Sequence, residues 1–282
     1  MSIYKYIKYH LKKISQSAIS NYQKFLSKYF LKNFDKDFKK IIIENRLLLE
    51  QESPFINKEI YLKNKYGIQE RIFKKINEPI NCELFYSDII VYLTKKYFPE
   101  NLSYLEIGGS VLKNALLVTE ATENSTIVIF DINEINPLKK DRFFNNKKNE
   151  NIYFQGSVLS KKDINRFNIK IKRKFNFVFS DALHTPEGLI QEFKYIYGSS
   201  LKEKFIIYFD DLDFPELLDT AKVIAFELKE KYPNVEFLTF KTFGWIGSNE
   251  PMHLNGLITN INIFNDLKVQ KFNLFRFKKV KI

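Results

Sequence analysis

Three aspartates and one histidine stand directly after two apolar runs in the second half of the chain: Asp181, His184, Asp210 and Asp211. A histidine titrates near neutral pH, and as a general base it contributes ~10²–10⁴-fold to a reaction that removes a proton. Three carboxylates offer oxygen ligands that suit Mg²⁺, which would hold a substrate oxygen and lower its pKa. In one interpretation His184 takes the proton beside Asp181 and Asp210. In the other, Asp181, Asp210 and Asp211 hold Mg²⁺, and the sequence leaves both open.

A second group of polar residues surrounds a pair of glycines near the middle of the chain. The apolar run 104–107 carries one acid, Glu106, and breaks at Gly108 and Gly109 before a helix-compatible run over 111–120. A short apolar run that ends in glycine before a helical pattern is typical of a strand, a tight turn and a helix. Glycines there let the backbone approach another group closely, and the helix start offers free N–H groups.

The next apolar run also ends in an acid. Residues 126–130 lead into Asp131, and an acid at the tip of the second strand of a nucleotide-binding sheet can bind ribose hydroxyls. The dinucleotide fingerprint G-x-G-x-x-G is absent, because Ser110 and Lys113 stand where its second and third glycines would be. A ligand with a ribose and no phosphate therefore fits best, and S-adenosylmethionine (SAM) is such a ligand.

The elements that must position these residues alternate between strand and helix patterns. Strands are predicted at 102–107, 126–131, 152–157, 175–181 and 205–211, followed by 235–242 and 256–264 with no helix between the last two. Helices are predicted at 85–98, 111–120, 137–146, 186–197 and 215–231. This order predicts an α/β fold: a Rossmann-like, seven-stranded, mostly parallel sheet with a closing antiparallel hairpin. A loop at 243–253, with Trp245 and His253, is a candidate substrate lid.

Four segments carry a resemblance to a known family: Leu105-Glu-Ile-Gly-Gly109, Phe130-Asp131, Phe179-Ser-Asp-Ala-Leu-His-Thr-Pro-Glu-Gly188 and Phe209-Asp-Asp211. Over roughly 85–265 the chain resembles the class I SAM-dependent methyltransferases. The third segment is similar to the I-D-G-L-H-T-Y-E segment of a bacterial methyltransferase-domain family associated with glycans and small hydroxylated compounds. The chain departs from that family at Ala182 and Pro186, where Gly and Tyr are usual, and it lacks the P-G-G that precedes the fifth strand.

The resemblance implies roles for individual residues. Glu106 and Gly108 would line the methionine side of SAM, Asp131 would hold the ribose hydroxyls, and Ser157 would lie by the adenine. The full set of cofactor-binding residues that it implies is Glu106, Gly108, Gly109, Ser110, Asp131, Ile132, Ser157, Asp181 and Ala182.

The function that we expect is O-methylation of a sugar, a glycan or another hydroxylated small molecule. The basic chain ends favour a nucleic-acid methyltransferase instead, but the Asn/Asp-Pro-Pro-aromatic signature of amino-group methylation is absent. The altered glycine loop and the missing P-G-G leave a third alternative, a methyltransferase-like binding or scaffold protein without catalysis.

The net charge of +12 is concentrated at the two ends of the chain. Residues 1–40 carry +8 and residues 268–282 carry +6, so the part between them is nearly neutral. Basic ends suit nucleic acid or anionic lipid, although an AT-rich genome also produces an excess of Lys, Asn, Ile and Phe. The near-neutral middle argues against a nucleic-acid groove over the site, and the oligomeric state is left open.

The first 80 residues are predicted to be a basic helical extension, and residues 81–282 the methyltransferase domain with a basic C-terminal tail. Within residues 1–30 apolar positions recur every three or four residues, so we expect an amphipathic helix. It either packs on the protein itself or contacts an anionic membrane surface. The single Cys82, the lack of a signal peptide and the lack of an apolar run near ~18 residues favour a cytoplasmic protein, with a membrane-peripheral alternative.

Overall fold

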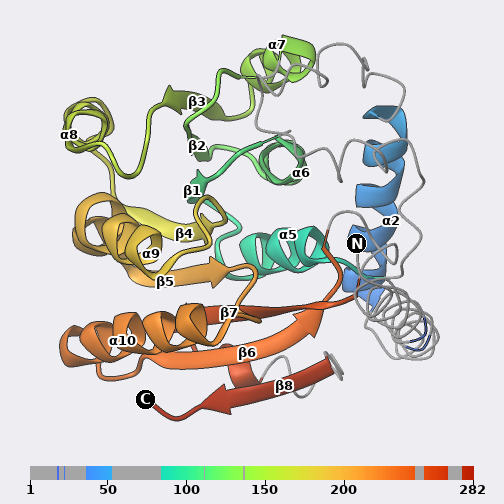
Figure 1. Ribbon diagram of the computed structural model, residues 1–282. Helices are drawn as coiled ribbons and strands as arrows, with labels where there is room; N and C mark the ends of the chain where they lie inside the picture. Colours follow the sequence, from blue (N-terminus) through green and yellow to red (C-terminus); the bar gives the residue numbers. More distant parts are fainter. Residues whose placement is uncertain are drawn as a thin grey trace, which may run out of the picture.

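The computed structural model is a single mixed sheet with helices on both of its faces (Figure 1). It describes Ala18, Tyr22 and residues 36–52, 84–110, 112–135, 137–244, 251–265 and 275–282. Within these residues, no helix is both long and apolar enough to cross a membrane.

The sheet has eight strands in the order β3-β2-β1-β4-β5-β7-β6-β8. The strands are β1 (Ser103–Ile107), β2 (Thr126–Asp131), β3 (Glu150–Gln155), β4 (Phe175–Ser180), β5 (Leu201–Phe209), β6 (Glu236–Thr242), β7 (His253–Thr259) and β8 (Phe275–Val280). The first five pair in parallel, and β7 runs antiparallel to both β5 and β6. The order of the parallel strands reverses between β1 and β4, which is where open α/β sheets bind ligands.

The helices form one layer on each face of the sheet. They are α2 (Lys36–Glu52), α5 (Tyr86–Tyr97), α6 (Lys113–Ala121), α7 (Pro137–Asn145), α8 (Lys161–Lys170), α9 (Pro186–Glu192) and α10 (Pro215–Lys231); a π-helical turn, η2 (Phe193–Tyr197), and a 3₁₀ turn, η3 (Gly198–Ser200), follow α9. One hydrophobic core joins α2, α5, α6 and α7 to one face, and the other joins α8, α9 and α10 to the opposite face. Figure 1 shows these two groups on either side of the sheet.

The central strands β1 and β4 are mostly apolar because both of their faces are covered. Every residue of β1 and β4 is buried, and the side chains of β4 alternate between the two cores: Phe177 and Phe179 face α5 and α6, whereas Val178 faces α9 and α10. Fully covered parallel strands read as continuous hydrophobic runs, so the same pattern that marks them in the sequence also explains their burial.

The predicted α/β architecture is confirmed, with one strand more than expected. The β2 strand and the α10 helix have the predicted bounds, while β7 begins three residues before its predicted start. The eighth strand, β8, lies in the segment predicted to be a basic tail and pairs antiparallel with β6. Its sequence Phe-Arg-Phe-Lys-Lys-Val opens with the apolar–polar alternation of a strand exposed on one face.

The predicted N-terminal extension contains α2, which packs on α5 through Phe38, Ile41 and Ile42 in the same core as the sheet. Of the amphipathic helix predicted over residues 1–30, only Ala18 and Tyr22 are described, and both are helical. The rest of that helix and the predicted lid residue Trp245 lie outside the described residues.

Candidate functional site

The loop after β1 lies directly on the chain that leaves β4. Gly108 has φ +93°, and a Cβ at this position would lie 2.4 Å from the carbonyl oxygen of Asp181. A Cβ on Gly109 would lie 2.4 Å from Cγ2 of Ile129. The close approach predicted from the two glycines is therefore an approach to the protein's own chain, and it fixes the loop over the β1–β4 reversal.

Asp131 holds this loop closed from the neighbouring strand. Its Oδ2 accepts a hydrogen bond from the backbone N–H of Ser110 (2.8 Å), and its Oδ1 accepts from the backbone N–H (2.7 Å) and the side-chain amide (2.9 Å) of Asn133. A carboxylate has about four lone-pair sites, so three are used inside the protein and one remains for a ligand hydroxyl. Asp131 thus shapes the loop as well as standing where a ribose was predicted.

Glu106 is enclosed beneath the loop, with only 1% of its surface exposed. Its carboxyl accepts hydrogen bonds from the Tyr104 hydroxyl (2.9 Å) and from the Asn114 side chain (3.5 Å). Burial raises the pKa of Glu106 well above its ordinary value, and hydrogen bonds from these two residues oppose the rise. The carboxyl is therefore enclosed by the protein and is held by side chains of β1 and α6.

Two predicted cofactor residues line one cavity of about 630 Å³ beside the ends of β2 and β3. They are Ile132, of which 64% is exposed, and Ser157. Gly156, Tyr153 and Gln155 complete this side of the cavity. Its volume lies within the range of small-molecule sites, roughly 300–1,000 Å³, and it stands where the adenine was predicted.

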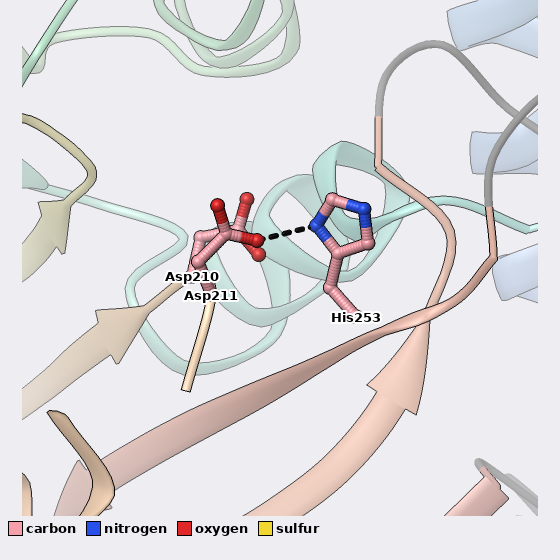
Figure 2. Close-up of side chains that lie close together, drawn as sticks. All are labelled: Asp210, Asp211 and His253. Carbon is pink, nitrogen blue, oxygen red and sulfur yellow. Dashed lines mark ion pairs between the residues drawn. The ribbon is translucent and has the colours of Figure 1, made fainter. Parts of the chain in front are cut away.

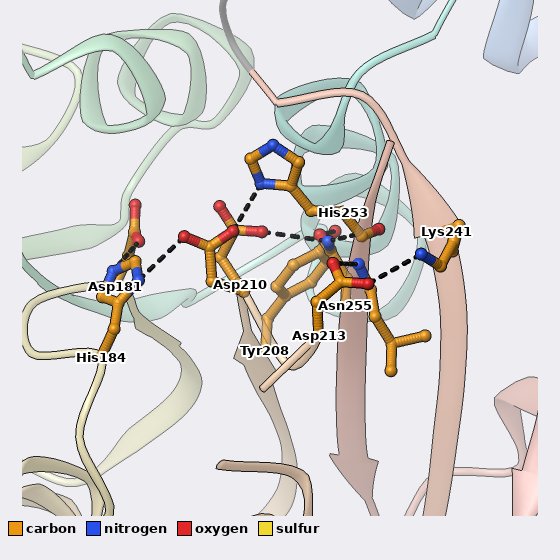
Figure 3. A network of polar contacts seen from close by, with 10 residues as sticks. Asp181, His184, Tyr208, Asp210, Asp213, Lys241, His253 and Asn255 are labelled. Atoms are coloured by element: carbon orange, nitrogen blue, oxygen red, sulfur yellow. Dashed lines mark hydrogen bonds and ion pairs between the residues drawn. The ribbon is translucent and has the colours of Figure 1, made fainter. Parts of the chain in front are cut away.

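Beyond β4, two histidines and two aspartates form a chain of ion pairs (Figure 3). Nε2 of His184 lies 3.3 Å from Oδ1 of Asp181, and its Nδ1 lies 2.8 Å from Oδ2 of Asp211. Nδ1 of His253 lies 2.5 Å from Oδ1 of Asp211. Asp211 therefore stands between the two histidines, and His184 stands between two carboxylates.

This arrangement leaves His184 protonated at neutral pH. Hydrogen bonds to Asp181 and Asp211 raise the pKa of His184 to about 10. Burial alone would raise the pKa of Asp211, but hydrogen bonds from His184 and His253 outweigh it and lower that pKa. A histidine that is charged, with both ring nitrogens bound to carboxylates, has no lone pair to take a proton, so this geometry favours a positioning role over the predicted general base.

Asp210 belongs to the same cluster and is held by separate hydrogen bonds. Its Oδ1 accepts a hydrogen bond from Nδ2 of Asn255 (3.0 Å), and the Tyr208 hydroxyl donates to Oδ1 of Asn255 (2.6 Å; Figure 3). Burial, reinforced by the charges of Asp181 and Asp211, raises the pKa of Asp210 to about 8. The pKa values of the consecutive carboxyls of Asp210 and Asp211 are thus shifted in opposite directions, upward for Asp210 and downward for Asp211.

The predicted metal ligands are only partly brought together. Asp210 and Asp211 each place a carboxylate oxygen, and His253 a ring nitrogen, within 4.8 Å of one another. Among the described residues, Asp181 is not part of such a set, and its Oδ1 is paired with His184. A set with an imidazole differs from the all-oxygen sets that Mg²⁺ prefers.

A buried glutamate lies behind β4, on the side of α9. The Ser180 hydroxyl and Oε2 of Glu192 are 2.5 Å apart, and Oε1 of Glu192 has no hydrogen-bond partner among the described residues. Burial raises the pKa of Glu192 to about 8; the hydrogen bond from Ser180 and the charge of His184 lower it, whereas Asp181 raises it. Glu192 is therefore largely protonated at neutral pH.

Two residues of the cluster were not predicted in their observed roles. His253 was expected in a loop but is the first residue of β7, and Asn255 was not predicted to belong to the site at all. The alternating sequence His-Leu-Asn-Gly over 253–256 is the signal that would have found both, because alternate residues of a strand share one face.

No family model and no curated protein matches this chain. Among solved structures, the O-methyltransferase TomG of Streptomyces achromogenes, in complex with SAM, is 14% identical with a TM-score of 0.45 over 61% of this chain and 78% of its own. An O-methyltransferase of Bacillus cereus, in complex with SAH, is 12% identical with a TM-score of 0.47 over 77% and 90%. A spermidine synthase of Thermotoga maritima is 17% identical with a TM-score of 0.43 over 67% and 65%. Likenesses at this level do not extend to function or to site residues.

Proposed function

We propose that this protein is a SAM-dependent methyltransferase whose acceptor is a hydroxyl group of a sugar, a glycan or another hydroxylated small molecule. The observation that carries the proposal is the reversal of strand order between β1 and β4, with a glycine loop on one strand and carboxylates at the tips of its neighbours. Ligands of open α/β sheets bind at such a reversal, and the absence of the G-x-G-x-x-G fingerprint from the sequence favours SAM over a dinucleotide.

The residues near the reversal fit this cofactor. The remaining lone pair of Asp131 can accept one ribose hydroxyl, and the cavity of about 630 Å³ beside Ile132 and Ser157 has the volume of a small-molecule site. When bound, SAM supplies an electrophilic methyl group. The chain's own residues bind it, orient the acceptor and remove a proton from the acceptor hydroxyl, and such positioning supplies much of the rate of a displacement.

Asp181 is the proton acceptor in this proposal. It follows β4 directly, its backbone contacts Gly108, and its carboxyl is held through Oδ1 by His184. Burial raises the pKa of Asp181, which brings its proton affinity closer to the range useful for a base near neutral pH. His184 acts through Asp181 and Asp211, which it holds in place, and is a positioning residue.

The first experiment is calorimetry with SAM, with NAD⁺ as the control ligand. Micromolar binding of SAM and none of NAD⁺ supports the assignment. Once an acceptor is found, Asp181→Asn should lower turnover by ~10²–10⁴-fold with little change in SAM affinity. His184→Gln should cause a smaller loss, and a larger loss in His184→Gln than in Asp181→Asn would return the base to His184.

A second candidate function is a binding or scaffold protein with this fold and no catalysis. The observation that favours it is the degree to which the loop is closed on itself: Gly108 contacts Asp181, and Asp131 already accepts three internal hydrogen bonds. The same calorimetry separates the two, because a scaffold of this kind would show no heat with SAM or with its demethylated product at millimolar concentration.

A further inference from the structure

Two carboxylates at the end of β5 and one imidazole at the start of β7 lie close enough together to bind a single metal ion. Figure 2 shows the carboxyl groups of Asp210 and Asp211 side by side and facing the imidazole of His253. One donor atom from each residue lies within 4.8 Å of the others, so a single cation can contact all three. The side chain of Asp211 is 19% exposed and that of His253 is 21% exposed, so an ion can reach them from solvent.

The backbone conformation at the end of β5 places the side chains of both aspartates on the same side of the chain (Figure 2). Successive residues of an extended strand point to opposite faces, so Asp210 and Asp211 would normally diverge. Asp211 instead has φ +56°, a left-handed conformation that is uncommon outside glycine and that aspartate tolerates better than most residues. Both aspartates follow Phe209, the last residue of β5, so the extended geometry ends before them, and Figure 2 shows the second carboxyl on the same side as the first.

The strand pairing then supplies the histidine. Because β7 is antiparallel to β5, its first residues rather than its last lie at the carboxyl ends of the parallel strands. Phe209 pairs with Gly256, which sets His253 beside the end of β5. Asn255, two residues along β7, holds Asp210 in turn and is itself held by Tyr208. Partners of this kind orient metal ligands in known sites.

We propose that Asp210, Asp211 and His253 bind a divalent first-row transition cation, such as Zn²⁺ or Mn²⁺, between β5 and β7. Two carboxylates provide the charge that neutralises the ion, and the imidazole selects for transition metals over Mg²⁺ and Ca²⁺, which take oxygen ligands. Three protein ligands leave positions for water or for an oxygen of a small molecule. This site differs from the Mg²⁺ site predicted from Asp181, Asp210 and Asp211, because the ligand from β7 replaces the one from β4. It does not depend on methyl transfer.

The test is direct binding of metal ions to the full chain after it has been stripped with a chelator. Calorimetry should give one site that binds Zn²⁺ more tightly than Mn²⁺ and does not bind Mg²⁺ at comparable concentration, following the usual order of affinities. Loss of an outer partner of a metal ligand costs ~10–100-fold in affinity, so loss of a ligand in His253→Gln or Asp211→Asn should weaken Zn²⁺ binding by at least ~100-fold. Thermal unfolding of each variant without metal verifies that it is folded.

Asp181→Asn is the matched control, since it removes a neighbouring carboxylate that is not a ligand in this site. It should leave the Zn²⁺ affinity within a few-fold of the unmodified protein. With Cu²⁺ as a spectroscopic probe, electron paramagnetic resonance should show nitrogen coupling that disappears in His253→Gln and persists in His184→Gln. Zn²⁺ binding that survives both His253→Gln and Asp211→Asn overturns the proposal. A loss in Asp181→Asn equal to that in His253→Gln also overturns it, by moving the ion between β4 and β5.

Discussion

The buried glutamate behind β4 makes the stability of this protein depend on pH in a direction that is unusual for a carboxyl group. Most carboxyls of folded proteins are paired as carboxylates, so acid destabilises them. Glu192 is fully buried against Ser180, and its pKa is raised to about 8. The perturbation that exposes this effect is Glu192→Gln, which keeps the shape of the side chain and removes its titration.

The sign and the size follow from the two protonation states. A glutamate in the unfolded chain titrates near ~4.3. Between that value and the folded value near 8, the folded state binds more protons than the unfolded state, so the free energy of unfolding falls as the pH rises. One proton contributes about 1.4 kcal/mol per pH unit, which amounts to about 3 kcal/mol between pH 5 and pH 7.5. The stabilisation by protonated Glu192 is thus present in acid and is lost as the pH passes through 8.

The measurement is urea unfolding of the unmodified protein and of Glu192→Gln at half-unit steps from pH 5 to pH 8. The difference in unfolding free energy between the two should shift by about 3 kcal/mol in favour of the variant as the pH rises. Glu227→Gln, an exposed position on α10, is the matched control and should show no such shift. A Glu192→Gln difference that stays constant across this range would mean that Glu192 is ionised in the folded protein, and the reasoning would fail.

Three further predictions concern the loop, the cofactor and the chain end. Gly108→Ala should destabilise the fold by at least ~2 kcal/mol, because Gly108 has φ +93° and lies against Asp181. Gly244→Ala is the control and should not destabilise the fold, because a Cβ there would lie 3.5 Å from its nearest atom. Urea unfolding midpoints of the two variants test this. Asp131→Asn should weaken SAM binding roughly ten- to hundredfold by calorimetry, since a charged hydrogen-bond partner is worth ~1.5–3 kcal/mol, and an unchanged affinity would contradict the ribose assignment. If residues 1–30 contact an anionic membrane surface, deleting them should abolish co-sedimentation with anionic liposomes and preserve SAM binding. A truncated chain that unfolds would instead assign that segment to the core.

Much of the fold follows from local patterns in the sequence. The runs that become β2 and β4 are apolar and bounded by polar residues, and α10 begins at Pro215, a residue that favours the first turn of a helix. The part that escaped prediction is β8, where alternating Phe and basic residues have the composition of a solvated tail. Its strand conformation depends on the open edge of β6, which is a tertiary partner that no local pattern reveals.

The site divides along the same line. A general rule for parallel strands placed Asp131, Asp181 and Asp210 at one end of the sheet, and the structure has them there. The pairing of His184 with two carboxylates and the entry of His253 from an antiparallel strand depend on side-chain packing across several strands. The charge states that such contacts set cannot be predicted from the sequence. His184 was predicted to be the base from the ordinary pKa of histidine, but the geometry around it favours a positioning role.

The position of β4 at the centre of the sheet has a consequence for local unfolding of the sheet and for which parts of the chain can change in sequence. With β1 on one side and β5 on the other, β4 opens only when the whole sheet opens, so its amides should be among the slowest to exchange with deuterated water. Asp181, which directly follows β4, is thus attached to the part of the sheet that we expect to open most rarely. Under the proposed function, a change of acceptor would involve the loops at the carboxyl ends of the strands, which can vary in length and sequence while the strands keep their geometry.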